Sequence, residues 1–181
     1  IQSAGWSTGV TLVDINTDGL LDIYVCRSGN YSAEKRKNQL LINNGVNPET
    51  GEPTFTESAE AYGIADTSYS TQSVFFDYDR DGDLDMYLLN HTNDIRNPNQ
   101  VRPLISDGTG LANDRLYRNN GNQVFTDVTV EAGILYDGLG LGVSVSDVNE
   151  DGWLDIFVTN DFIASDYLYI NNQDGTFIEA A

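Results

Sequence analysis

One nine-residue pattern occurs three times in this chain, with the same spacing of aspartate, asparagine and glycine. The copies are DINTDGLLD at Asp14–Asp22, DYDRDGDLD at Asp77–Asp85 and DVNEDGWLD at Asp147–Asp155, each of the form D-x-[DN]-x-D-G-x-x-D. Together they hold 12 of the 28 acidic residues of the chain. Carboxylates packed this densely repel one another in a folded protein unless a cation neutralises them. The pattern therefore predicts three metal-binding loops, and a solvated acidic turn is the alternative interpretation.

The sequence on either side of the three loops repeats as well. Each loop lies between two short runs rich in β-branched and aromatic residues, and two more such runs follow, separated by Gly, Asn and Asp. The runs are Val10–Val13, Ile23–Val25, Gln39–Gly45 and Thr54–Glu57; Ser73–Phe76, Met86–Leu88, Arg115–Gly121 and Val124–Asp127; and Val143–Ser146, Ile156–Val158, Tyr167–Asn172 and Thr176–Glu179. A sustained helical period is missing. The sequence predicts an all-β fold of three tandem four-stranded antiparallel units.

The repeat divides the chain into units at residues 1–63, 64–133 and 134–181. The second and third runs of each unit are joined by connections of different length, at residues 30–38, 90–114 and 161–165. Insertions at one place in a repeat emerge on one face of an array, often a binding face. Because the chain begins at a repeat junction and its third unit is truncated at the C-terminal end, we expect a stretch of a longer array.

The loop spacing assigns a role to each position. Alternate residues of a tight loop point inward, so positions 1, 3 and 5 offer side-chain oxygens, position 7 a backbone carbonyl, and position 9 a closing carboxylate; glycine at position 6 allows a sharp turn. The predicted metal ligands are Asp14, Asn16, Asp18, Leu20 and Asp22; Asp77, Asp79, Asp81, Asp83 and Asp85; and Asp147, Asn149, Asp151, Trp153 and Asp155.

These ligands favour calcium over other ions. Ca²⁺ takes six to eight oxygen ligands, whereas Mg²⁺ prefers a tighter octahedron with several waters and Zn²⁺ prefers His or Cys. An EF-hand is excluded because position 12, which should be Glu, is Val25, Leu88 or Val158 inside a predicted strand. The sequence therefore predicts three Ca²⁺ sites. The middle loop has four ligand carboxylates against three in each of the others, so we expect it to bind most tightly.

Several motifs resemble a known family. The loop pattern is followed by Asp155–Asn160 in the third unit, and the second unit contains Phe125–Thr129 and the ending Glu131–Ile134. With Leu168-Tyr169 and Asn171-Asn172, these residues resemble the FG-GAP/VCBS repeat family, and most nearly its ASPIC/UnbV and cartilage-acidic-protein-like subgroup. The resemblance implies blades of a seven-bladed β-propeller, with Ca²⁺ in hairpin loops of the integrin-α type. The three repeats would then form a partial propeller or a segment of a longer array.

The charge of the chain excludes some classes of partner. With 28 acidic and nine Lys or Arg residues, the net charge is −19. Nucleic acids and anionic membrane surfaces are bound by clustered Lys and Arg, so neither is expected as a partner. The longest apolar runs are far shorter than the roughly 20 residues of a membrane span, so no membrane insertion is expected. A single cysteine, Cys26, excludes an intramolecular disulfide.

Three functions remain open. The first is a non-catalytic, calcium-binding extracellular module that serves as a scaffold or adhesion surface for a protein or glycan at the cell surface. The second is a self-assembling subunit of an extracellular filament or surface layer, because blades need neighbours on both faces. The third is a carbohydrate-binding propeller that uses Tyr31, Tyr69 and Tyr136.

Neither catalysis nor glycosylation has strong support in the sequence. Cys26 occupies an ordinary strand position, and His91 has no evident nucleophile beside it, so we expect that the protein is not an enzyme. Asn30 and Asn90 match N-glycosylation motifs, a pattern that arises often by chance in an Asn-rich chain.

Overall fold

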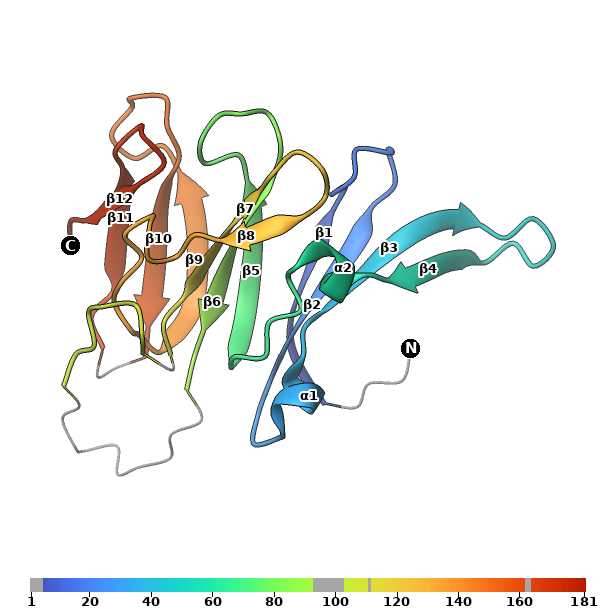
Figure 1. Cartoon of the computed structure of the whole chain (residues 1–181), viewed down its shortest axis with the longest axis horizontal. Coiled ribbons are helices and arrows are strands. Elements are labelled where there is room, and N and C mark those ends of the chain that lie inside the picture. The colour runs from blue at the N-terminus through green and yellow to red at the C-terminus, as the bar shows by residue number, and fades with distance from the viewer. Residues whose placement is uncertain (1–4, 93–102, 111, 162–163) are drawn as a thin grey trace.

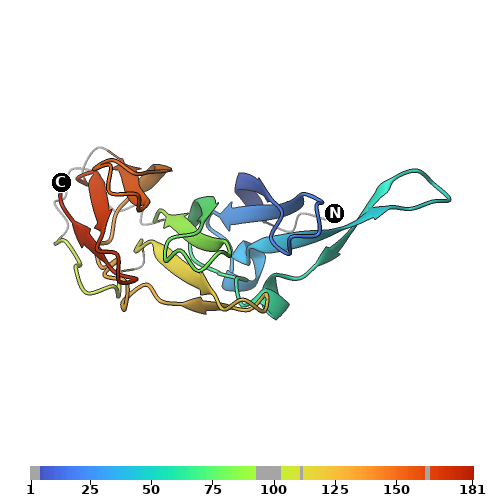
Figure 2. The same ribbon diagram turned by 90° about the horizontal axis from the view of Figure 1, so that it is seen from above.

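A computed structural model of the chain describes residues 5–92, 103–110, 112–161 and 164–181 (Figure 1). It contains three four-stranded antiparallel sheets and two helices of four residues, so the predicted all-β fold is confirmed. The sheets follow the chain in order, and we call them blades 1, 2 and 3. They lie side by side in a fan that is not closed into a ring (Figure 2). Residues 93–102 and 111 of the second predicted insertion, 162–163 of the third, and 1–4 lie outside the described part.

Within each blade the strands pair in the order in which they occur in the chain. Helix α1 (Ala33–Arg36) lies between β2 and β3, and α2 (Ala59–Tyr62) follows β4. The strands are β1 (Trp6–Val13), β2 (Asp22–Ser28), β3 (Gln39–Val46) and β4 (Pro53–Glu57) in blade 1; β5 (Ser70–Phe76), β6 (Asp85–Asn90), β7 (Arg115–Asn119) and β8 (Phe125–Asp127) in blade 2; and β9 (Gly140–Ser146), β10 (Asp155–Asn160), β11 (Tyr167–Asn171) and β12 (Phe177–Glu179) in blade 3.

Strand pairing places the three acidic loops at hairpin tips. The residue before each loop pairs with its ninth residue, as in Val13 with Asp22, Phe76 with Asp85 and Ser146 with Asp155. All three tips lie along one edge of the molecule, at the top of Figure 1. Helix α1 and the described residues 103–110 lie at the opposite edge. The loops and the insertions are therefore separated by the length of the blades.

Two apolar cores hold the blades together, one at each junction. Because successive side chains of a strand point to opposite faces, β6 supplies residues to both cores. Met86 and Leu88 pack against blade 1, whereas Tyr87 and Leu89 pack against blade 3, and all four are fully buried. The sequence Met-Tyr-Leu-Leu is continuously apolar because blade 2 has a neighbour on both faces.

The outer blades each keep one face exposed. In blade 1, Val10 and Leu12 lie on the face away from blade 2 and are 66% and 59% exposed. In blade 3, Phe157 and Ile178 lie on the face away from blade 2 and are 40% and 57% exposed. Across the described residues, no helix has the length and apolar character that a membrane span requires.

A side chain at the start of the third strand ties that strand to the second. In blade 2, Asp114 accepts hydrogen bonds from the Tyr87 hydroxyl and the Asn90 N–H, both at 2.7 Å. In blade 1, the amide of Asn38 takes this place, accepting from the Arg27 N–H at 2.7 Å and donating to the Tyr24 hydroxyl at 3.2 Å. Burial raises the pKa of Asp114 to about 7. In blade 3, the exposed Asp166 accepts from the Asn160 N–H at 2.8 Å. The same tie is thus made with a neutral amide in blade 1 and with an acid in blades 2 and 3.

We predict a pH-dependent stability that can be traced to Asp114. An unfolded aspartate titrates at about 3.9, so between this pH and about 7 the folded chain binds more protons than the unfolded chain. The stability contributed by Asp114 is complete below about pH 4 and is lost as the pH rises through about 7. Asp114→Asn, which introduces the residue that blade 1 has at Asn38, has no group that titrates here. It should therefore remove this pH-dependent loss in the free energy of unfolding, which is at most about 4 kcal/mol.

Urea unfolding of both chains from about pH 5 to about pH 8 measures the effect. The advantage of Asp114→Asn over the parent chain should grow as the pH rises. A constant difference between the two chains would contradict the prediction.

Candidate metal centres

The carboxylate at position 1 organises each loop. In the first loop, Asp14 accepts hydrogen bonds from the Asp18 N–H at 3.0 Å and the Gly19 N–H at 2.9 Å, and Asp147 makes the corresponding bonds in the third loop. In the middle loop, Asp77 Oδ2 accepts from the Gly82 N–H at 3.1 Å. The glycines at position 6 have φ values of 86°, 98° and 89°, a region that favours glycine.

Position 4 is also left-handed, although none of the loops has glycine there. Its occupants Thr17, Arg80 and Glu150 have φ values of 58°, 62° and 60°. This conformation costs a non-glycine residue on the order of 1 kcal/mol or more. Sequence reasoning missed this feature because the three residues share no chemical property.

The ninth position fixes the loop to the sheet. Asp22, Asp85 and Asp155 are at most 1% exposed, and each accepts two backbone N–H donors. One donor is at loop position 2, and the other belongs to an asparagine in the third strand. The pairs of donors are Ile15 and Asn43, Tyr78 and Asn119, and Val148 and Asn171, at distances between 2.7 and 3.1 Å. The carboxylate therefore joins the hairpin tip to β3, β7 or β11.

The partner asparagines return a hydrogen bond. The side chains of Asn43, Asn119 and Asn171 donate to the backbone carbonyl just before the ninth position, at Leu21, Leu84 and Leu154. Sequence analysis used these asparagines only to align the repeat and did not assign them to the site. Their recurrence at one place in every unit was the available indication.

Positions 3 and 5 distinguish the middle loop from the other two. Asn16 donates its side-chain amide to Asp18 Oδ2 at 3.0 Å, and Asn149 donates to Asp151 Oδ2 at the same distance. The middle loop has Asp79 at position 3, which offers no such donor. At position 7, the N–H groups of Leu20, Asp83 and Trp153 donate to the carboxylate at position 5. Of the three loops, the middle loop thus has the most carboxylates and the fewest hydrogen-bond donors to them.

The pKa shifts of the middle loop reflect this imbalance. Burial, together with the charge of Asp81, raises the pKa of Asp79 and of Asp83. Burial raises the pKa of Asp85 to about 8, with smaller contributions from Asp79 and Asp83. In the third loop the pKa of Asp151 is instead lowered, mainly by the hydrogen bond from the Trp153 N–H. A cation would relieve the repulsion in the middle loop.

The middle loop fits a hard divalent cation. Oxygens of Asp77, Asp79 and Asp85 lie within 4.8 Å of one another. In the described part of the chain, this is the one group of three or more carboxylate, imidazole or thiol side chains placed so closely. Asp77 Oδ1 and Asp83 Oδ1 are buried without a hydrogen-bond partner among the described residues. Orphaned oxygens of this kind are the ligands that Ca²⁺ takes in proteins.

The other candidate residues lie outside the three metal loops. Burial raises the pKa of the Cys26 thiol to about 12, which disfavours a reactive thiolate. Of the three tyrosines considered for sugar stacking, Tyr69 lies beneath the Arg36 guanidinium, which also donates to the Tyr31 carbonyl. Tyr136 packs against Tyr167, so the rings of Tyr69 and Tyr136 are already in contact with other side chains. Of the two glycosylation motifs, Asn30 is exposed, whereas Asn90 is fully buried and donates to the Asn113 carbonyl.

Comparison with known proteins identifies the repeat. A family model described as FG-GAP-like repeat matches residues 14–88 and 104–158, which include all three loops. Among curated proteins, cartilage acidic protein 1 of Homo sapiens is 25% identical over 177 residues, which is 98% of this chain and 26% of the relative. The chain therefore spans about a quarter of the length of this relative.

We predict that the ninth and fifth positions of a loop respond differently to the same substitution. Asp22→Asn leaves one of two buried N–H donors facing an amide donor, and should lower the free energy of unfolding by about 1–3 kcal/mol without any metal. Asp18→Asn alters an exposed side chain, and should change metal-free stability by less than about 0.5 kcal/mol. Denaturant unfolding in excess chelator tests both. Equal effects of the two substitutions would contradict the assignment.

Proposed function

The chain belongs to the FG-GAP-like repeat family, and from this premise we propose that it is a non-catalytic, calcium-stabilised module of an extracellular protein. The observation that carries the proposal is the middle loop, in which Asp77, Asp79 and Asp85 converge and the buried Asp77 Oδ1 has no hydrogen-bond partner among the described residues. Asp81 and the Asp83 carbonyl would complete the ligand set. The first and third loops have the same spacing and would hold two further ions.

The role of the ions in this proposal is structural. The hydrogen bonds of positions 1 and 9 already define each loop, so a cation adds stability to a loop that the backbone has shaped. By neutralising carboxylates at the hairpin tips, bound ions also reduce the repulsion in a chain of net charge −19. The bound chain would then act as a rigid support.

An extracellular location is supported by two observations. Calcium sites of extracellular modules often have dissociation constants of about 10⁻⁴–10⁻³ M, which the calcium level outside cells can fill. The similarity to a protein named for cartilage and for its acidity agrees with this location. The partner in this proposal is a protein or glycan at the cell surface. It would bind at the edge with α1 and residues 103–110, because the opposite edge holds the metal loops.

The assignment as a non-catalytic module rests on the family and on the two residues best suited to nucleophilic or acid–base chemistry. Cys26, the single cysteine, is buried in the core between blades 1 and 2. His91, the single histidine, is hydrogen-bonded through Nδ1 to the backbone of Thr92. Neither lies at the metal loops.

We predict that the chain binds three calcium ions and that they raise its thermal stability. Each site filled at ten times its dissociation constant should add about 1.4 kcal/mol to the free energy of unfolding. Native mass spectrometry counts the ions, and calorimetry with calcium or chelator reports the stability. Asp79→Asn copies Asn16 and Asn149 of the other loops. It should keep all three ions and weaken the middle site to the affinity of the other two, because it removes the extra ligand carboxylate. Equal masses and equal melting temperatures with calcium and with chelator would refute the calcium proposal.

The exposed end faces favour a second candidate function, self-assembly. In blade 2, Ser73 occupies the position of Val10 in blade 1, and Tyr87 occupies the position of Phe157 in blade 3. Ser73 and Tyr87 are 3% and 0% exposed because they lie at blade junctions. The outer face of blade 3 could therefore pack on the outer face of blade 1 in another copy. Such a head-to-tail contact leads to rings or open filaments.

We predict for this candidate that the mean mass rises with protein concentration in sedimentation equilibrium with calcium present. Phe157→Glu places a charge on the end face and should abolish the rise. Val124→Glu is the matched control, because Val124 is 44% exposed in the turn between β7 and β8 and away from both end faces. A monomer at every concentration would exclude self-assembly.

A further inference from the structure

At each blade junction, an arginine of one blade stacks on an aromatic ring of the next. At the junction of blades 1 and 2, the Arg36 guanidinium lies 4.2 Å from the centroid of the Tyr69 ring, and its Nε donates to the Thr67 carbonyl at 3.1 Å. At the junction of blades 2 and 3, the Arg80 guanidinium lies 4.9 Å from the Trp153 ring. Arg36 belongs to α1 at the insertion edge, whereas Arg80 lies at the edge that carries the metal loops. The same type of contact is thus made at opposite edges.

The middle metal loop itself makes the contacts to blade 3. Arg80 is loop position 4, between the predicted ligands Asp79 and Asp81. Tyr78 is loop position 2, and its backbone carbonyl accepts a hydrogen bond from the Asn171 side chain at 2.9 Å. The centroid of the Tyr78 ring lies 5.9 Å from that of the Phe177 ring. In blade 2, the equivalent Asn119 donates its side-chain amide to Leu84 of its own blade.

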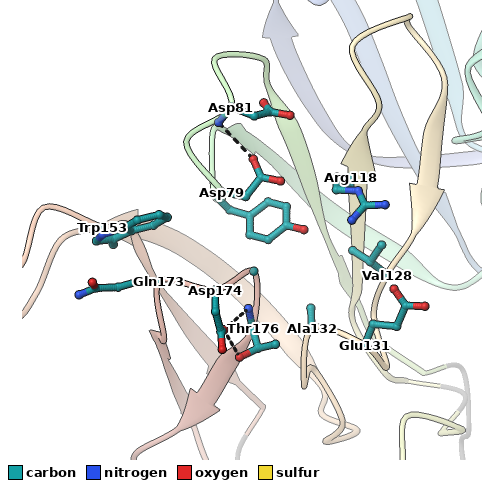
Figure 3. A pocket seen from close by; sticks show the side chains of 12 residues that line it. Asp79, Asp81, Arg118, Val128, Glu131, Ala132, Trp153, Gln173, Asp174 and Thr176 are labelled. Carbon is teal, nitrogen blue, oxygen red and sulfur yellow. Dashed lines mark hydrogen bonds between the residues drawn. The ribbon is translucent and has the colours of Figure 1, made fainter.

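A crevice beneath these contacts separates the middle loop from blade 3 (Figure 3). It has a volume of about 400 Å³. Asp79, Asp81 and Arg118 line the side of blade 2, and Trp153, Gln173 and Asp174 line the side of blade 3. Side chains do not fill this space, so blade 3 does not hold the loop in place by close packing here. The contacts of Arg80 and Tyr78 with blade 3 therefore depend on the conformation of the loop itself.

We propose that a divalent cation in the middle loop clamps blade 3 onto blade 2. This inference rests on the proposed calcium binding. Ligands at positions 1, 3 and 9 enclose positions 2 and 4, so a cation that holds Asp77, Asp79 and Asp85 also fixes the Tyr78 carbonyl and Arg80. Without the cation, repulsion among the carboxylates raises the population of opened loops, in which both contacts with blade 3 are lost. The junction of blades 1 and 2, pinned by Arg36 at the other edge, should not respond to this ion.

Hydrogen exchange resolved by peptide tests the clamp in a chain with one working metal loop. Asn16→Ala and Asn149→Ala remove the position-3 ligand from each outer loop, and leave the residues of the middle loop and Trp153 unchanged. Calcium at ten times the dissociation constant of the middle site reduces the population of opened loop about tenfold. The amides of β11 and β12 should therefore exchange about tenfold more slowly with calcium than with chelator. The amides of β2 and β3 should change less than about twofold.

Two further substitutions separate the clamp from general stabilisation. Arg80→Ala should reduce the calcium effect on β11 and β12 to less than about threefold. Arg36→Ala, the matched control, removes the same type of contact at the other junction. It should speed exchange in blade 1 equally with and without calcium, and should keep the tenfold effect in blade 3.

Native mass spectrometry of the same samples distinguishes the two proposals. If no calcium ion binds, the proposed metal site and the clamp both fail. If one ion binds while exchange of β11 and β12 is unchanged, or changes no more than that of β2 and β3, the clamp alone fails. The comparison of blade 3 with blade 1, made in the chain that keeps Arg80, tests the clamp even if Arg80→Ala does not fold.

Discussion

The buried carboxylate at the ninth loop position is the interaction on which each blade depends. It accepts one N–H from the hairpin tip and one from the third strand, so it joins two segments that are distant in sequence, such as Ile15 and Asn43 around Asp22. Without it, two buried N–H groups would lack acceptors, at a cost of about 1–3 kcal/mol each. The acids of the loop therefore have two roles. Positions 1 and 9 shape the backbone, and in the middle loop their carboxylates also converge with Asp79 on the proposed metal site.

This division explains how much of the fold and of the site the sequence could predict. Runs of β-branched and aromatic residues, together with turn residues, located every strand, because those signals are local. The glycine at position 6 was also predictable, since only its own φ is involved. The bond between Asp85 and Asn119 joins residues 34 positions apart, and no local pattern encodes it. The hydrogen bond from Asn16 to Asp18 was missed for another reason: the sequence was compared by ligand charge at position 3, but only an amide there can also donate to the neighbouring carboxylate.

The composition of the second strand in each blade shows what the outer faces are suited to. In β6 both faces are buried, and both are apolar. In β2 and β10 only one face has a neighbouring blade, yet the other still carries Ile23 and Val25 in β2, beside the buried Arg27, and Phe157 in β10. A strand adapted to face water would alternate apolar and polar residues. The outer faces thus have the character of junction faces, as expected where each unit of a repeat contacts only its neighbours.

The placement of the few cations follows from the same architecture. The blade faces are apolar and the loops are acidic, so adjacent loop edges bring carboxylates of neighbouring blades together. At the junction of blades 2 and 3, Arg80 offsets this repulsion, and after the hydrogen bond from the Trp153 N–H its charge contributes to the lowered pKa of Asp151 in the third loop. Arg36 and Arg80 each also stack on an aromatic ring, which adds about 0.5–1 kcal/mol at an exposed site. Arg36 lies outside any metal loop, so its contact is built into the apo chain. Arg80 lies within the middle loop, so its contact with Trp153 depends on how that loop is held. A cation that holds the carboxylates on either side of Arg80 fixes the loop, and this makes the junction of blades 2 and 3 the one whose strength depends on the ion.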